Sequence, residues 1–173
     1  WTLDVAPTSD SLLKAMRKGT RYSILKAIRE GVTVSQHTDS TAVADFYSLF
    51  KETVVRHPTF VPFTQGYIQQ ELAAFAKSNE AVLFLGRYKA EVLAGALVIY
   101  HGASAYYHQG ASSQRFSNIP AAYAVQWAAI EEAKKRGCLL YNFWGIADEG
   151  TDHPWSGITF FKKGFGGFET RLL

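Results

Sequence analysis

The chain has 173 residues, of which 47% are hydrophobic and 19% are charged, and its formal net charge is +3. This length and composition predict a single globular domain with a full hydrophobic core. No apolar run reaches the roughly 18 residues that a membrane span requires, and the start shows no signal-peptide pattern. The single cysteine, Cys138, excludes an internal disulfide framework and indicates a reducing compartment.

The first part of the chain predicts the end of a strand followed by a basic helical segment over residues 8–30, which Gly19 could divide into two helices. Between Lys14 and Glu30 this segment has one acidic residue, Glu30, and six basic ones, namely Lys14, Arg17, Lys18, Arg21, Lys26 and Arg29. A basic half-face suits phosphate in nucleic acid, in a nucleotide diphosphate or in lipid headgroups, and an ordinary solvated face is the alternative. We therefore interpret residues 1–31 as a strand end and basic linker, and residues 32–173 as the main domain.

The remainder of the chain alternates predicted strands and helices. The expected order is a strand at 32–37, helices at about 40–56 and 64–77, three antiparallel strands at 81–88, 92–100 and 105–111, a helix from about 118 to 136, a strand at 139–144, a short helix and a final strand at 168–173. Ser117 or Asn118 is expected to cap the helix that has Pro120 in its first turn. Because residues 139–144 are apolar except for Asn142, this strand is expected to be buried on both faces.

This succession of elements resembles the GNAT-type acyltransferase fold. The resemblance implies an α/β (α+β) domain with a mixed, mostly antiparallel sheet flanked by helices, here preceded by a pair of basic linker helices. In that fold the sheet splays between its central strands, and the active site lies in the resulting cleft.

The stretch before the helix near residue 120 departs from the acetyl-CoA-dependent members of that superfamily. Those members have a loop of the form Q/R-x-x-G-x-G/A, whose amides hold a diphosphate at a helix N-terminus. Here residues 114–121 read QRFSNIPA, with neither glycine, and Pro120 lacks an amide donor. The sequence therefore predicts acyl transfer without acetyl-CoA, and no other cofactor is expected.

Four motifs resemble the FemABX peptidoglycan aminoacyltransferases. They are YxFxGI at 141–146, GxxxFKKGFGG at 157–167, RYxIxKAxxxGV at 21–32 and GAS at 110–112. The resemblance covers essentially the whole chain and corresponds to the second of the two GNAT-like domains of the family, together with the linker helices that lead into it. It implies transfer of an amino acid from aminoacyl-tRNA to an amino group of the stem peptide on lipid II or UDP-MurNAc-pentapeptide.

The same resemblance implies a cytoplasmic protein, peripheral to the inner membrane face at most. The family's first GNAT-like domain is expected to be a missing N-terminal partner, so this chain is either a truncated form or a natural half-size relative.

By the same resemblance, Phe161 and Lys162 occupy the catalytic positions, and Lys162 stabilises the tetrahedral intermediate of acyl transfer. Aminolysis of an ester needs a neutral amine and a positive group near the developing oxyanion, and it produces a hydroxyl leaving group that must regain a proton. A lysine on an aromatic-lined wall can provide that charge. The structural alternative is that both lysines extend from a surface helix. Lys163 is expected on the outer face or on tRNA phosphate.

Further substrate-binding positions are predicted less directly. Tyr106 and Tyr107 alternate along a strand, so one of them should point into the cleft. Tyr67 corresponds to a family tyrosine of the second helix, but Phe63 stands where the family often has an arginine that binds the acceptor diphosphate. Arg21, Arg115 and the basic helix face are assigned to phosphate contacts, and Tyr22 and Gly145 to substrate binding. Trp144 and Trp155 are expected to flank a peptide channel, and packing in the core is the alternative for such large aromatics. His101 and His108 lack a carboxylate at ligand spacing, so no metal site is expected.

Two functions from other classes remain open at this point. One is a lone half-protein that binds tRNA or precursor without turnover. The other is an N-acyltransferase that uses acyl-CoA.

Overall fold

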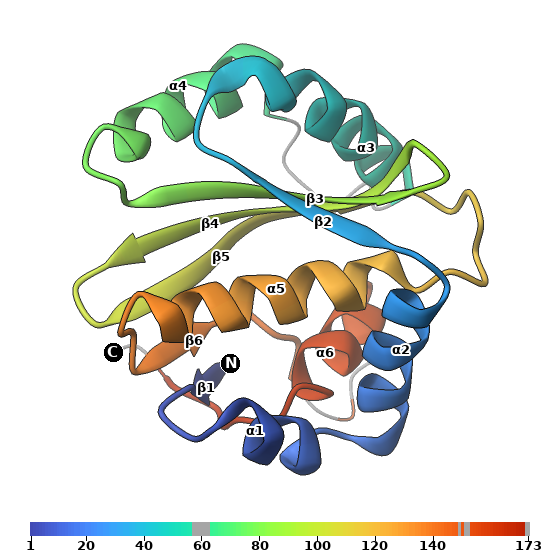
Figure 1. Ribbon diagram of the computed structural model, residues 1–173, viewed down its shortest axis with the longest axis vertical. Helices are drawn as coiled ribbons and strands as arrows, with labels where there is room; N and C mark the ends of the chain where they lie inside the picture. The colour runs from blue at the N-terminus through green and yellow to red at the C-terminus, as the bar shows by residue number, and fades with distance from the viewer. Residues whose placement is uncertain (57–62, 149, 151–152, 172–173) are drawn as a thin grey trace.

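The computed structural model describes residues 1–56, 63–148, 150 and 153–171. Its elements are β1 (Thr2–Asp4), α1 (Ser9–Ala15), α2 (Lys18–Arg29), β2 (Thr33–His37), a 3₁₀ turn (Ser40–Ala42), α3 (Val43–Arg56), α4 (Gln65–Ala76), β3 (Ala81–Tyr88), β4 (Glu91–His101), β5 (Ser104–Ser112), α5 (Ala121–Lys135), β6 (Leu140–Asn142) and α6 (Ser156–Lys163). The six strands form one sheet in the order β1-β6-β5-β4-β3-β2. Helices α3 and α4 cover one face, and α5 lies on the other with α1, α2 and α6 beyond it (Figure 1).

The central strands are buried on both faces and divide the core into two clusters. Along β3, Val82 and Phe84 belong to the cluster beneath α5, and Leu83 and Leu85 to the cluster beneath α3 and α4. This alternation follows from the two-residue repeat of a strand. The predicted three-strand meander and the helices before it are confirmed, and the buried Cys138 lies in the α5 cluster as a core residue.

The sheet opens between β5 and β6, which form its parallel pair. The two strands are paired only where Ser104–Tyr106 lie beside Leu140–Asn142. Strand β6 ends there, and Trp144 takes a left-handed conformation with φ of 71°, whereas β5 continues to Ser112. The second half of β5 therefore borders a cleft, as the expected GNAT-like fold requires.

Two local predictions are corrected. The basic segment does break into two helices, but at Met16 and Arg17 and not at Gly19, because Met16 is buried and the Arg17 amide donates to the Gly164 carbonyl (3.0 Å). The N-cap of α5 is Pro120, which has no side chain able to cap, so neither Ser117 nor Asn118 fulfils that role.

The strand predicted at 139–144 is shorter and less buried than expected. Tyr141 and Phe143 are fully buried, whereas Leu139 and Trp144 are 56% and 52% exposed. Strand β6 lies next to the edge strand β1, and α5 packs on one face of β6. Helices α3 and α4 pack against β3, β4 and β5 and therefore do not bury the other face of β6. Of the final strand predicted at 168–173, the described residues contain a single bridge, between Phe168 and Thr2.

Residues 1–31 contribute directly to this sheet and core. Strand β1 pairs with β6, and α2 packs against α5. Core side chains from this segment include Leu3, Leu12, Met16 and Ile24. A domain boundary near residue 31 stays a prediction. In the described part of the chain, no helix is both long and apolar enough to cross a membrane.

Candidate active site

A cavity of about 490 Å³ occupies the cleft where β5 and β6 diverge. Its walls come from the second half of β5, from α3, from α5, from the loop after β6 and from α6. Of the predicted site residues, six line it: Tyr107, Trp144, Gly145, Trp155, Phe161 and Lys162. These residues span 56 positions of the sequence, and the splayed sheet brings them together.

Lys162 is the buried cation of this cavity. Its residue is only 7% exposed, and Nζ donates a hydrogen bond to the Gly145 carbonyl at 2.6 Å. Burial lowers the pKa of the ammonium to about 8, because a charged group loses hydration in the low-dielectric interior. An ammonium has three N–H donors, so the bond to Gly145 leaves two for a ligand in the cavity. Such a group can stabilise an oxyanion and can also release a proton.

Helix α6 is held rigidly enough to place this ammonium. The Thr159 hydroxyl accepts from the Ala147 amide at 2.8 Å, which ties α6 to the loop that carries Gly145. On the outer side, the Arg17 guanidinium lies 3.7 Å from the centre of the Phe160 ring. On the inner side, Phe161 packs edge-on against Tyr123 of α5, with ring centroids 4.8 Å apart. The helix is therefore fixed from three directions.

Because of Lys162, the free energy of unfolding should vary with pH in the alkaline range. The unfolded ammonium keeps its proton up to a pKa of 10.5, whereas the folded one loses it near 8, so the unfolded state binds more protons between these values. Relative to Lys162→Met, the free energy of unfolding of the wild type is expected to rise by about 3 kcal/mol from pH 8 to pH 10.5. Urea unfolding of both proteins across this range measures the difference. A constant difference would mean that the ammonium is hydrated.

A β-bulge shapes the β5 wall of the cavity. The pairing with β4 shifts between Leu97 and Val98, which face Gln109 and Tyr107, so His108 is the extra residue. Tyr107 and Gly110 then lie on the same face, and a Cβ at Gly110 would overlap the Tyr107 hydroxyl. Burial raises the pKa of Tyr107 to about 12, so its phenol is neutral at physiological pH.

The sequence of the chain matches an established family over more than half of its length. Residues 64–173 match the FemAB family. The chain belongs to this family. FemA of Staphylococcus epidermidis is 40% identical over 60 residues, which are 34% of this chain and 14% of FemA. FemA of Staphylococcus aureus is 38% identical over a segment of the same length.

Solved structures show the same fold. FemX superposes on this FemAB-family chain with a TM-score of 0.85 at 20% identity, over 95% of this chain and 57% of FemX. An aminoglycoside N-acetyltransferase in complex with CoA superposes with a TM-score of 0.61 at 11% identity, over 82% of this chain and 91% of its own. The GNAT-like fold is thereby confirmed. The chain spans little more than half of FemX, and the matched segment is a seventh of FemA.

Several predicted residues of this FemAB-family chain lie outside the cavity lining. Arg21 donates to the carbonyls of Leu13 and Lys14, which joins α1 to α2, and Tyr22 is exposed on α2. Lys163 lies with its ammonium 5.1 Å from the centre of the Trp1 ring. Their assignment to substrate binding stays a prediction.

The predicted tyrosines occupy different positions relative to the cavity. Tyr107 lines it, whereas Tyr106 packs edge-on against Trp144, with ring centroids 6.2 Å apart. Tyr67 stacks on Phe63, with ring centroids 4.7 Å apart. An aromatic pair therefore stands where the family resemblance suggested an arginine and a tyrosine.

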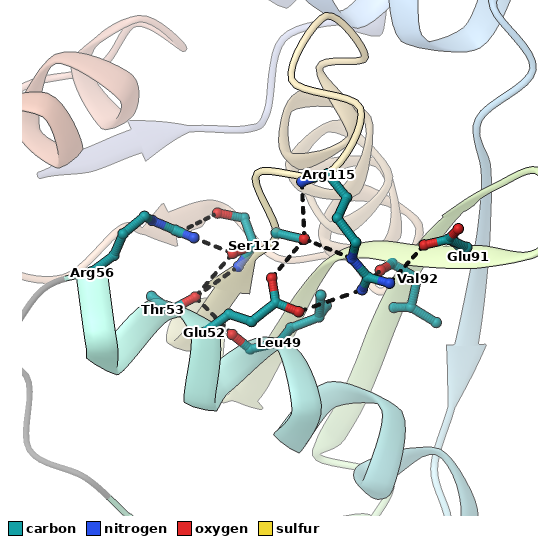
Figure 2. Close-up of polar contacts among 9 residues, drawn as sticks. Leu49, Glu52, Thr53, Arg56, Glu91, Val92, Ser112 and Arg115 are labelled. Carbon is teal, nitrogen blue, oxygen red and sulfur yellow. Dashed lines mark hydrogen bonds and ion pairs between the residues drawn. The ribbon is translucent and has the colours of Figure 1, made fainter.

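Arg115 is bound to acidic side chains beside the loop that follows β5 (Figure 2). Its guanidinium lies 2.6 Å from Glu91 and 3.5 Å from Glu52, and Nε donates to the Ser113 hydroxyl. In the same network Arg56 donates to the carbonyl of Ser112 at 2.9 Å (Figure 2). Arg56 and Ser112 line the cavity, and Arg115 does not.

The polar residues of the cavity that sequence reasoning missed include Arg56, His108 and Gln126. Gln126 is buried and accepts from the Tyr141 hydroxyl at 2.8 Å. No short-range pattern marks any of the three, because each acquires its partner from a distant segment. Among the residues that the structure describes, no three His, Cys, Asp or Glu side chains gather as metal ligands.

Proposed function

We propose that this chain is the aminoacyl-transferring part of an enzyme that moves an amino acid from aminoacyl-tRNA to an amino group of a peptidoglycan precursor. The acceptor would be the stem peptide of lipid II or of UDP-MurNAc-pentapeptide, and the product an interpeptide bridge. The observation that carries the proposal is the buried Lys162 ammonium in the cleft wall of a FemAB-family chain. The relative FemA is an aminoacyltransferase, which supports the reaction class.

The chemistry of this transfer matches what Lys162 offers. The amine attacks the ester carbonyl carbon, and negative charge develops on the carbonyl oxygen. An ammonium donor that is largely withdrawn from water, as Lys162 is, stabilises that charge more strongly than water does. When the C–O bond breaks, a proton must reach the 3′-oxygen of the leaving tRNA, and an ammonium with its pKa near 8 is a suitable donor.

This proposal implies a cellular compartment for the reaction and a set of binding partners. Aminoacyl-tRNA is the donor, so the reaction would occur in the cytoplasm, with lipid II reached at the inner membrane face. The chain spans 57% of FemX, and we propose that a second GNAT-like domain works with it in binding the precursor.

Transfer of a radiolabelled amino acid tests the proposal. The chain is incubated with labelled aminoacyl-tRNA and either lipid II or UDP-MurNAc-pentapeptide, alone and with a family N-terminal domain added. Labelled precursor that requires the chain is the expected result. Binding of tRNA or precursor without any labelled product in either arrangement would favour a binding module and overturn the enzyme assignment.

We expect no binding of CoA in the micromolar range. The amides at the start of α5 are already engaged, because Ala121 donates to the Ile119 carbonyl (2.9 Å) and Tyr123 to that of Pro120 (3.1 Å). Arg115, the cation of that loop, is paired with Glu91. A diphosphate would therefore find few free donors. Isothermal titration calorimetry with CoA checks this expectation, and a micromolar Kd would support an acyl-CoA N-acyltransferase instead.

A further inference from the structure

A histidine–carboxylate pair faces the same cavity as Lys162 and has no role in the function proposed above. His108 Nε2 lies 2.7 Å from Glu71 Oε1, which joins β5 to α4. The other ring nitrogen, Nδ1, has no hydrogen-bond partner among the described residues, and His108 lines the cavity. One nitrogen is thus anchored on the carboxylate while the other remains available to a ligand.

The local backbone explains why His108 points here. It is the extra residue of the β5 bulge, and a bulge redirects one side chain out of the regular alternation of a strand. The Trp144 ring packs edge-on against the imidazole, with ring centroids 5.6 Å apart, and limits its rotation. The imidazole is therefore held between α4 and the loop that carries Gly145.

The environment of Glu71 favours a firmly held histidine. The Glu71 side chain is only 9% exposed, and its Oε2 atom is buried without a hydrogen-bond partner in the described residues. A buried carboxylate with one oxygen unsatisfied gains strongly from a donor on the other oxygen. Only a weak second contact is present, from the Tyr67 hydroxyl at 3.4 Å. His108 is consequently the main partner of this carboxylate.

The groups around the imidazole determine its protonation. Hydrogen bonding to Glu71 raises the pKa of His108 above its usual value, and partial burial opposes this effect. The Tyr67 hydroxyl of α4 contacts Glu71, and the other titratable or charged groups that line the cavity are Tyr107 from β5, Arg56 from α3 and Lys162 from α6. An imidazole with a carboxylate on one nitrogen is a suitable group for accepting a proton on the other.

We propose that His108, positioned by Glu71, is the proton acceptor for the attacking amine in this cavity, an inference that rests on the proposed aminoacyl transfer. The acceptor amine arrives as an ammonium and gives one proton to His108 Nδ1. Its lone pair then forms the N–C bond to the ester carbonyl, and the C–O bond to the tRNA breaks. The second proton lost by nitrogen goes to the 3′-oxygen by way of Lys162, and His108 returns its proton to water.

Steady-state transfer across pH distinguishes this role from a structural one. His108→Gln is expected to lower kcat roughly 100-fold or more, with little change in KM and with loss of the acidic limb of the pH profile. Glu71→Gln removes the charge that favours protonated His108, so its acidic limb should move to lower pH. The matched control is His101→Gln, which breaks an exposed histidine–glutamate pair (His101 with Glu80, 3.1 Å) outside the cavity and should leave the profile unchanged.

The outcomes separate the two proposals. If the wild type transfers and His108→Gln stays within threefold of it, or if the acidic limb of Glu71→Gln does not move, the role of His108 falls while the proposed function stands. If the wild type transfers nothing, both fall. As an independent readout, the His108 ring resonances in NMR should shift when a lysine-containing peptide with a free ε-amine is added, and the absence of a shift would overturn the inference.

Discussion

Lys162→Met is expected to lower kcat for aminoacyl transfer by roughly 10²–10³-fold, the range found when a single donor to a developing oxyanion is removed. The ammonium touches the cavity, is fixed by the Gly145 carbonyl and is largely withdrawn from water. Methionine preserves most of the side-chain volume but has neither charge nor N–H donor. KM for tRNA should change little, because the lost interaction is made chiefly in the transition state.

This substitution should leave the protein folded. Removing a buried charge relieves its desolvation, so the melting temperature at pH 7 should be equal to or higher than that of the wild type. The matched control is Lys135→Met on α5, whose side chain is 81% exposed and lies outside the cavity lining. Transfer by Lys162→Met at the rate of this control would remove Lys162 from the mechanism.

Gly167→Ala is expected to cost about 3 kcal/mol or more of the free energy of unfolding, a large part of the stability of a domain of this size. Gly167 has φ of +100°, where an L-residue is strained, and it lies against the first strand of the sheet. A Cβ there would overlap the Thr2 carbonyl oxygen and lie 3.2 Å from the Leu3 Cα. Because both contacts are with backbone, no side-chain rotation relieves them.

Two other glycines serve as graded controls for this prediction. Gly102 has φ of +57° but open space around its Cα, so Gly102→Ala should cost only about 1–2 kcal/mol. Gly66 lies in α4 with open space and ordinary φ, and Gly66→Ala should be neutral or stabilising by up to about 1 kcal/mol. Urea unfolding monitored by circular dichroism gives all three values. A cost at Gly167 no greater than at Gly102 would show that the contact with Thr2 is absent.

The glycine motif after Lys162 shows how one pattern can have two readings. Glycines beside Lys162 can leave room either for a ligand or for the close approach of another backbone. In the structure, Gly167 approaches the backbone of Thr2. At this position the glycine makes room for another backbone. The close approach allows Phe168 to form a β-bridge with Thr2 of β1.

The sequence by itself determined the order of the elements and the GNAT-like fold. The strand periodicity of residues 81–111 and the helical periodicity before them depend on side chains within a few positions of one another, so they can be read locally. The motif that contains Phe161 and Lys162 likewise indicated a short helix, and both residues line the cleft.

Only the tertiary structure decided which polar groups meet. Glu71 and His108 are 37 residues apart, and Arg115 is drawn away from the cleft by Glu91, which lies 24 residues earlier. The helix break at Met16 depends on Gly164, and the exposure of Leu139 depends on the position of β6 beside β1. These outcomes arise from long-range packing and from the pairing of buried charges, which no local pattern of residues encodes.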